Sequence, residues 1–242
     1  MIDPSQLYTI PGGDFRLPPE PSGPWFVPRS QEQAGVVRCV AVMPARLRDL
    51  GFKVSTGPLV WNRHKQQLRD DYEEGCYPLI WAESVCPDGV FRFRAEKRGH
   101  KPYFKLFSPG DDWLTIDQPC ALLQRTTAKE QKRRLVAAEI PASFMREHGK
   151  VVVENHLNMV VPLNGPSEIT AETMTAVLNS PMVDQVFRCL NGSVAVSAYE
   201  LEALPLPSMK QLLRIQDMLC SGVSREYLEK EIERCYVASS IA

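Results

Sequence analysis

Long hydrophobic stretches are missing from this chain of 242 residues. Its longest unbroken apolar run is the five residues Cys39–Met43, whereas a transmembrane helix needs about 20 apolar residues in succession. The first residues, Met1–Ser5, include no basic group and lead into no apolar stretch, so they do not resemble a secretory signal. These absences predict a cytoplasmic protein with no membrane partner.

Paired cysteines and recognised catalytic motifs are missing as well. The seven cysteines are irregularly spaced and form no C-x-x-C pair, which favours reduced thiols over a disulfide framework or a zinc knuckle. The four histidines are scattered, and none stands at a metal-ligand spacing from a cysteine, so no metal site is predicted. Neither a glycine-rich cofactor loop nor a P-loop, G-x-S-x-G or H-E-x-x-H motif occurs. No catalytic residue is therefore assigned.

Composition is that of an ordinary globular protein, with 44% apolar and 24% charged residues. The length allows one large domain or one domain with an appendage. The net charge of -1 hides a strong asymmetry, because residues 36–150 carry twenty basic and fourteen acidic groups and residues 151–242 carry six and eleven. A positive middle segment suits a polyanionic partner. On charge alone, a solvated basic face with no partner explains it equally well.

Seven prolines lie within the first 30 residues. Proline fixes the backbone in a conformation that excludes the interior of helices and central strands. Residues 1–35 are therefore expected to form an extended linker or strap, and a further segment is expected to precede it.

Apolar residues between positions 36 and 161 occur in short bursts that predict strands. Phe91–Arg94 alternates apolar and basic residues with a period of two, as a half-buried strand does. Turn formers such as Pro87-Asp88-Gly89 separate the bursts. One helix is expected to interrupt them, at residues 44–50 or 62–72. The other bursts, expected to build a twisted, mostly antiparallel sheet, are Val36-Val37, Leu79–Trp81, Tyr103–Phe107, Leu135-Val136, Val151–Val153 and Met159–Val161.

Residues 162–242 are predicted to be mainly helical, which gives an α+β fold ending in a helix hairpin. Ser197 and Glu200 have the spacing of a capping box, which marks a helix start. The other helices are expected at Thr170–Leu178, from Pro181 onward, at Ser208–Leu219 and at Ser224–Tyr236. The acidic residues expected on the outer face of the hairpin, pointing away from nucleic acid, are Glu226, Glu229, Glu231 and Glu233.

Three clusters of basic residues, interleaved with polar and aromatic side chains, lie in the positive segment. Lysine and arginine neutralise phosphates, whereas arginine, asparagine and glutamine read base edges. A solvated charged face explains each cluster taken singly, but three clusters in one segment favour a nucleic-acid interface. They are Trp61–Gln67, Arg92–Lys101 on a predicted hairpin, and Gln124–Arg134.

Two other functions fit parts of the sequence. Asp88 or Asp112, together with Glu130 and Lys132, approximates the carboxylate set that holds a divalent cation in many restriction nucleases. The separation is long, and Thr127 with Glu130 has the spacing of a helix capping box, which is the preferred interpretation. A protein-interaction module, with its basic residues spread over opposite faces, is the remaining alternative.

Several segments, taken in order along the chain, carry a family resemblance. They are Gly23–Trp25 with Pro28-Arg29, Val54–Lys65, Leu122–Thr127, Glu154–Asn158, Leu178–Ser180, Gly192-Ser193 and Leu201–Pro207. Together they resemble the C-terminal target-recognition region of bacterial restriction–modification N6-adenine DNA methyltransferases, of the kind with a TaqI-like specificity domain. The resemblance covers nearly the whole chain and implies a module that recognises a sequence in double-stranded DNA.

One part of that family's pattern is absent. Its members carry an N-terminal domain with a cofactor loop and an Asn-Pro-Pro-Tyr/Phe motif, whereas none of the six asparagines here precedes a proline. The resemblance therefore implies the specificity part alone, with no activity and no cofactor of its own. S-adenosylmethionine is expected in an adenine methyltransferase catalytic domain that acts in cis or in trans.

Three parts are expected: a linker (1–35), a DNA target-recognition domain (36–207) and a C-terminal helix hairpin (208–242). Because Asn155, His156 and Asn158 lie between apolar strands, a fold-holding hydrogen-bond network is the favoured interpretation for them. All residues expected at the DNA interface are Thr56, Trp61, Asn62, Arg63, His64, Lys65, Arg92, Arg94, Arg98, Lys101, Arg125, Thr126, Thr127, Lys129, Arg133, Asn155, His156 and Asn158.

Overall fold

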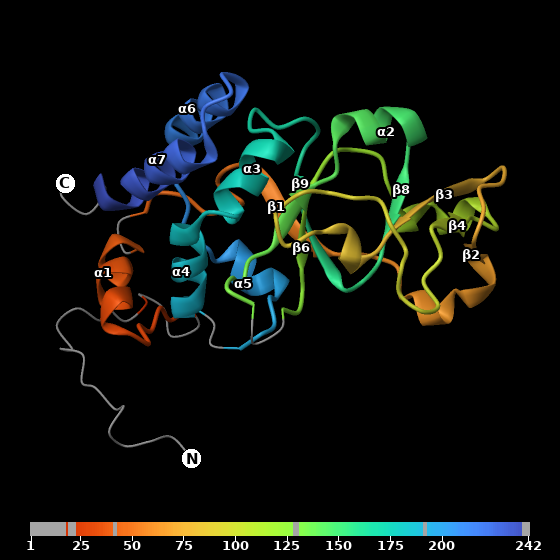
Figure 1. Cartoon of the computed structure of the whole chain (residues 1–242), viewed down its shortest axis with the longest axis horizontal. Coiled ribbons are helices and arrows are strands. Elements are labelled where there is room, and N and C mark those ends of the chain that lie inside the picture. Colours follow the sequence, from red (N-terminus) through yellow and green to blue (C-terminus); the bar gives the residue numbers. More distant parts are fainter. Residues whose placement is uncertain (1–17, 19–22, 41–42, 128–130, 191–192, 239–242) are drawn as a thin grey trace, which may run out of the picture.

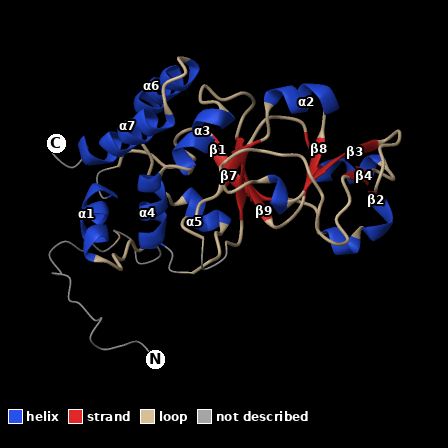
Figure 2. Cartoon of the chain, in the orientation of Figure 1, coloured by secondary structure: helices blue, strands red, loops and turns tan. Residues whose placement is uncertain are grey.

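The computed structural model describes residues 18, 23–40, 43–127, 131–190 and 193–238. Most α-helices gather at one end of the molecule, and the strands occupy its centre and its other end (Figure 1, Figure 2). The α+β class predicted from the sequence is confirmed. No helix within the described ranges is long and apolar enough to cross a membrane.

A four-stranded antiparallel sheet lies at the centre, with the strand order β1–β9–β6–β7. Its two faces contribute to different cores, because alternate side chains of a strand point to opposite sides. Leu123 and Val160 pack among the C-terminal helices, whereas Leu122 and Met159 pack toward the other end. Burial on both faces explains the continuous apolar runs in the sequence. The strands are β1 (Phe52–Thr56), β6 (Ala121–Gln124), β7 (Ala137–Glu139) and β9 (Leu157–Pro162).

A second sheet forms the end of the molecule away from the helices, with the strand order β2–β4–β3–β8–β5. Only the β3–β8 pair is parallel among its pairings, so the mostly antiparallel character is confirmed. Its core surrounds the fully buried rings of Trp81 and Phe104. The strands are β2 (Leu68–Arg69), β3 (Cys76–Ile80), β4 (Tyr103–Lys105), β5 (Thr115–Ile116) and β8 (Val151–Val153).

The C-terminal helices follow the predicted start signals. Thr170 accepts a hydrogen bond from the Thr173 backbone N–H at the start of α3, and Ser197 forms the predicted capping box with Glu200. The chain ends in the predicted pair of packed helices, whose connection turns at Gly222 with a φ of 68°. The helices are α3 (Ala171–Leu178), α4 (Pro181–Leu190), α5 (Ala198–Glu202), α6 (Met209–Cys220) and α7 (Arg225–Ala238).

The first apolar burst does not form a strand, contrary to the prediction. Val36 and Val37 belong to helix α1 (Gln31–Val40), which packs against α4 and α7. Val36, Val37 and Val40 are all buried, a spacing that fits one face of a helix. Two adjacent valines carry no period of their own, so the strand preference of valine misled the interpretation.

The expected interrupting helix is also wrong in place and kind. Residues 47–50 form a turn, and residues 61–67 form two short 3₁₀ helices, η3 (Trp61–Arg63) and η4 (Lys65–Gln67). The α-helix that interrupts the strands of residues 52–162 is α2 (Ala142–His148) instead. It follows Pro141 and ends at Gly149, which has a φ of 71°. A proline before the helix and a glycine after it are start and stop signals that the sequence did contain.

Phe91–Arg94 is not a strand, and the segment up to Lys101 is not a hairpin. The rings of Phe91 and Phe93 pack against Phe144 of α2, at centroid distances of 5.2 and 5.4 Å, and Phe93 also contacts Tyr103 of β4 edge-on at 6.0 Å. Period-two alternation therefore marks an extended segment here without marking a sheet.

One acidic residue of the terminal hairpin faces inward, contrary to the prediction. Glu231 is only 6% exposed, and its carboxylate lies 3.1 Å from the Arg214 guanidinium and also contacts Arg234. Burial of this charge is tolerated because two guanidinium groups neutralise it.

Candidate functional site

Four segments that the sequence singled out meet where the two sheets join. Thr56, at the end of β1, pairs with Asn158 of β9, and the Arg125 N–H after β6 donates to the His156 carbonyl at 3.0 Å. The Asn155 N–H donates to the Leu59 carbonyl at 3.0 Å, just before the Trp61–Lys65 segment. Residues far apart in the sequence are thereby held on one framework.

Gly57 makes this junction possible. A Cβ atom at this position would stand 2.2 Å from the Glu154 carbonyl oxygen and 2.8 Å from the Val153 carbonyl oxygen. Only glycine lets the two backbones approach this closely. The Gly57-Pro58 dipeptide therefore fixes how the following segment leaves the sheet.

Asn158 holds the junction from inside. Its side chain is fully buried, its Nδ2 donates to the Val196 carbonyl at 2.8 Å, and its Oδ1 accepts from the Thr56 hydroxyl at 3.3 Å. Thr127, which is 2% exposed, donates its N–H to the Val194 carbonyl. Because these side chains are enclosed, they position the neighbouring strands.

His156 is presented on the surface by a buried carboxylate. Glu154 is 1% exposed, and its two oxygens lie 2.5 Å from the His156 Nδ1 and 2.9 Å from the His156 backbone N, which donates to it. The imidazole itself is exposed. The Arg125 Nη1 donates to the Asn155 carbonyl at 2.6 Å. These bonds fix the turn between β8 and β9, and the Nε2 of His156 has no hydrogen bond to any described residue.

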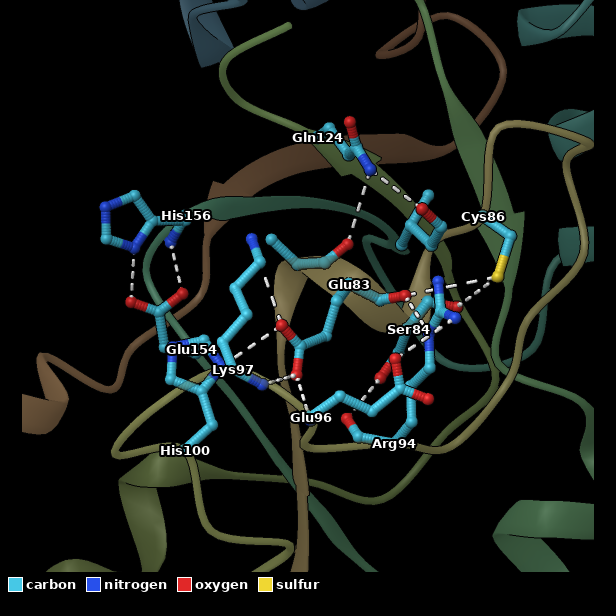
Figure 3. A network of polar contacts seen from close by, with 12 residues as sticks. Glu83, Ser84, Cys86, Arg94, Glu96, Lys97, His100, Gln124, Glu154 and His156 are labelled. Carbon is cyan, nitrogen blue, oxygen red and sulfur yellow. Dashed lines mark hydrogen bonds and ion pairs between the residues drawn. The ribbon is translucent and has the colours of Figure 1, made fainter.

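A second buried carboxylate, which sequence reasoning did not identify as a site residue, shapes the loop that carries Lys97 and Arg98 (Figure 3). The Glu83 Oε1 accepts from the backbone N–H groups of Glu96 and Lys97 at 2.6 and 3.2 Å. Its Oε2 lies 3.3 Å from the Nδ1 of His100. A glutamate in the alternating, partly apolar stretch around it gives no sequence signal of this role.

Aromatic stacking completes that loop. The His100 ring stacks on Trp81 at a centroid distance of 3.7 Å and an interplanar angle of 10°. The Trp81 Nε1 donates to the Lys101 carbonyl at 2.7 Å. Trp61 contacts both rings edge-on, at 6.0 Å from Trp81 and 6.4 Å from His100. The predicted Trp61 is thus a partly buried anchor that ties its own segment to the loop.

The segment after Trp61 presents donors from a fixed base. The His64 Nδ1 lies 2.8 Å from the Gln67 Oε1, and the buried Gln67 amide donates to the Lys105 carbonyl and to Asp111, each at 3.0 Å. Asn62, Arg63 and Lys65 are exposed on this base. The Lys65 ammonium lies 5.8 Å from the Trp61 ring centroid, in cation–π range.

Four other predicted cations are engaged within the chain. Arg92 pairs with Asp88 at 2.7 Å, which holds the pKa of that carboxyl below its usual range, and Lys101 pairs with Asp70 at 2.5 Å. The Arg94 Nε donates to the Glu83 carbonyl at 2.6 Å. Arg133 donates to the carbonyls of Asn179 and Pro87 at 2.6 and 2.9 Å.

Other predicted residues differ in accessibility. Thr126 and Arg98 are exposed, and Arg98 has no ion pair within the described part of the chain. Lys129, together with Glu130 of the nuclease alternative, lies outside the described residues. Where the structure is described, no three His, Cys, Asp or Glu side chains are grouped to hold a metal ion. Asp112 of the same alternative pairs with Lys150 at 2.5 Å.

Two curated proteins are similar in sequence to this chain. It is 30% identical over 182 residues to the type II methyltransferase M.PstI of Providencia stuartii, covering 74% of this chain and 35% of that protein. It is 31% identical over 171 residues to the type II methyltransferase M.BsuBI of Bacillus subtilis, covering 70% of this chain and 33% of that protein.

No family model matches the chain. A chain in a solved structure of a type I restriction–modification system aligns with 87% of this chain and 50% of its own length, at 11% identity and a TM-score of 0.42. Both methyltransferases are similar to this chain over most of its length, and the similar part spans about a third of each methyltransferase. The chain is therefore a domain related to the type II methyltransferases of restriction–modification systems.

Proposed function

We propose that this chain is the target-recognition part of an N6-adenine DNA methyltransferase. It binds duplex DNA and selects the sequence to be methylated. Methyl transfer from S-adenosylmethionine belongs to a catalytic part, acting in cis or in trans, and the chain works in the cytoplasm where that DNA is. The similarity to M.PstI and M.BsuBI supports the enzyme class, and the arrangement of donors supports the recognition role.

The observation that carries the proposal is the Asn62–Lys65 segment. Three exposed donors, Asn62, Arg63 and Lys65, stand on a base held by the buried Gln67 and by Trp61. Recognition needs donors whose positions are set before binding, because ordering flexible side chains costs affinity. Arginine and asparagine can make paired hydrogen bonds to base edges, while lysine contacts phosphate.

The other predicted residues divide into contacts and supports. Arg98, Thr126 and His156 are exposed and join the first group. Thr127 and Asn158 are buried, and the half-buried Thr56 donates its hydroxyl to Asn158. We assign all three a positioning role, as favoured from the sequence for Asn158. Arg92, Arg94, Lys101, Arg125 and Arg133 have partners within the chain and are placed with the supports.

The test is duplex binding by the whole chain across a salt series. Arg63→Ala should lower affinity by about 1–3 kcal/mol and relax sequence preference at one base pair. Lys65→Ala should weaken all duplexes alike and reduce the slope of log K against log salt by about 1. Lys210→Ala is the matched control, an exposed lysine of α6 that should bind like the parent. Failure of the parent chain to retain any duplex at low salt would refute the proposal.

A further inference from the structure

A cavity of about 440 Å³ lies between the end of β7, the loop at residues 88–91, helix α3 and the α6–α7 turn. It belongs to none of the segments assigned to DNA. Much of its wall is apolar, including Phe91, Leu219 and Val223. Gly89 closes one end, where a Cβ atom would stand 2.9 Å from the Asn179 amide nitrogen.

Two carboxylates face this cavity without a cation. Glu139 is the last residue of β7 and Glu172 lies in the first turn of α3, and neither has an ion pair or side-chain hydrogen bond among the described residues. The other charged groups of the wall are already matched, since Arg225 pairs with Glu229 at 2.9 Å and Asp88 pairs with Arg92. The cavity therefore carries two carboxyl groups, beside apolar surface, that pair with no cation of the described residues.

Burial, and then the charge of Glu172, raise the pKa of Glu139 to about 7. Two carboxylates that repel one another in a partly dry site favour binding of a positive group, which would relieve the repulsion. Arg225 lies in the same wall, but its guanidinium pairs with Glu229 and not with Glu139 or Glu172.

A hydroxyl group supplies a third acceptor. Thr175 is 7% exposed, and its Oγ1 has no hydrogen-bond partner among the residues that the structure describes. It lies on the stripe of α3 that lines the cavity, with Glu172, Ala176 and Asn179 at the i, i+3, i+4 and i+7 spacing of one helix face. A buried hydroxyl without a partner costs free energy, which a donor entering the cavity would recover.

We propose that this cavity binds an alkylammonium group, a primary amine carried on an aliphatic chain. An ammonium group has three donors and no acceptor. Glu139 and Glu172 only accept when they are ionised, and the Thr175 hydroxyl oxygen can accept as well as donate. The aliphatic chain lies against Phe91, Leu219 and Val223, as lysine stems cover apolar surface elsewhere. The site is independent of DNA recognition. Its amine comes from a free polyamine or from a lysine side chain.

Two probes separate these sources when titrated into the full chain by NMR or calorimetry. Putrescine represents a free diamine, and Nα-acetyl-lysine methylamide represents a lysine side chain. Saturable binding of either probe, with shifts at Glu139, Glu172 and Thr175, supports the site, and the tighter probe names the source. 1,4-Butanediol, which has the same chain and no charge, should not bind. If neither amine binds saturably, the inference is wrong.

Variants make the assignment residue-specific. Glu172→Gln and Glu139→Gln should each weaken the bound amine about tenfold or more, because each removes a charge-assisted hydrogen bond. Glu74→Gln, an exposed glutamate in the turn before β3, makes the same charge change and should leave affinity unaltered. Glu172 is exposed on a helix, so its variant folds even where Glu139→Gln does not. Equal affinity in Glu172→Gln and the parent would overturn the site.

Affinity should also rise between pH 6 and pH 8 as Glu139 loses its proton. The groups around it are Glu172 on α3, the Asp88–Arg92 pair on the loop and the Arg225–Glu229 pair on α7. An affinity that is flat over this range would refute the part given to Glu139.

Discussion

The two ends of the molecule handle charge in opposite ways. In residues 151–242, five of the six basic residues form ion pairs within the helical part, and Lys210 is the one without an ion pair among the described residues. At the junction of the sheets, Arg63 and Arg98 are exposed with no ion pair among the described residues. The helical end pairs five of its six cations within itself and leaves only Lys210 for a polyanion among the described residues, whereas the strand end presents Arg63 and Arg98.

The two ends also differ in how they are held together. The helical end has one large apolar core, which includes Phe187, Leu212 and Tyr236. The strand end has strands of two to five residues and relies on buried polar side chains such as Glu83 and Gln67 to fix its loops. Hydrogen bonds are directional, so they can hold an exposed loop in one conformation where apolar packing alone would not.

The largest test of this difference removes one fully buried ring from each end. Trp81→Ala and Phe187→Ala should each lower the free energy of unfolding by about 3–5 kcal/mol, because both side chains are fully buried. Only Trp81→Ala should also reduce duplex binding, since its ring carries His100 and its Nε1 holds the Lys101 carbonyl. Denaturant unfolding gives the stability of each variant. Duplex binding is then measured at denaturant concentrations below the unfolding midpoints of both variants. A similar loss of binding in Phe187→Ala would remove the distinction between the ends.

A smaller effect is expected at Glu83. Its carboxylate accepts the N–H groups of Glu96 and Lys97, and Glu83→Ala would leave both donors without it, at a cost of about 1–3 kcal/mol. Glu96→Ala is the control, because that side chain is exposed and makes only a 3.5 Å ion pair with Arg94. Hydrogen exchange should show faster opening of residues 94–101 in Glu83→Ala alone. Unchanged exchange there would mean that the Trp81–His100 stack holds the loop without Glu83.

Much of the helical end could be predicted from the sequence, and less of the strand end. Local signals mark helices: the caps at Thr170, Ser197 and Ser208 lie within one turn of the groups that they bond. The contacts of Glu83 and Gln67 depend on residues 13 to 44 positions away, which no local pattern contains.

The residues of the candidate site also divide into those that a local sequence pattern indicates and those whose state depends on distant contacts. Asn62, Arg63 and Lys65 could be named because donors cluster in the sequence beside a Gly-Pro turn. Arg92 pairs with Asp88 and Lys101 pairs with Asp70. These ion pairs depend on side-chain geometry, which the sequence does not show.

A pH series compares Glu139, at the boundary of the two ends, with an exposed glutamate. The folded-state pKa of about 7 lies above the ordinary value of 4.5, so ionisation is harder in the folded than in the unfolded chain. The loss of folding stability caused by ionising Glu139 is absent below pH 4.5, grows between pH 4.5 and about pH 7, and is complete above about pH 7. Glu139→Gln should therefore raise Tm at pH 8 by about 2–4 °C, corresponding to about 1 kcal/mol, and by less at pH 5. Glu74→Gln should show no such pH dependence, and an equal gain at both pH values would contradict the assignment.

The smallest expected effect concerns the ion pairs of the helical end. Lys230 pairs with Glu226 one turn away at 2.8 Å, and both side chains are mostly exposed, whereas Lys210 is an exposed helical lysine without a pair in the described chain. Lys230→Ala should cost about 0.3–0.5 kcal/mol more than Lys210→Ala, the usual value of an exposed i, i+4 pair. A double-mutant cycle with Glu226→Ala isolates the pair, and its coupling should vanish in about 1 M salt, where the screening length falls to about 3 Å. Neither lysine variant should change duplex affinity. A coupling that persists in high salt, or a loss of duplex binding in Lys230→Ala, would show that the helical end does not simply neutralise its own charge.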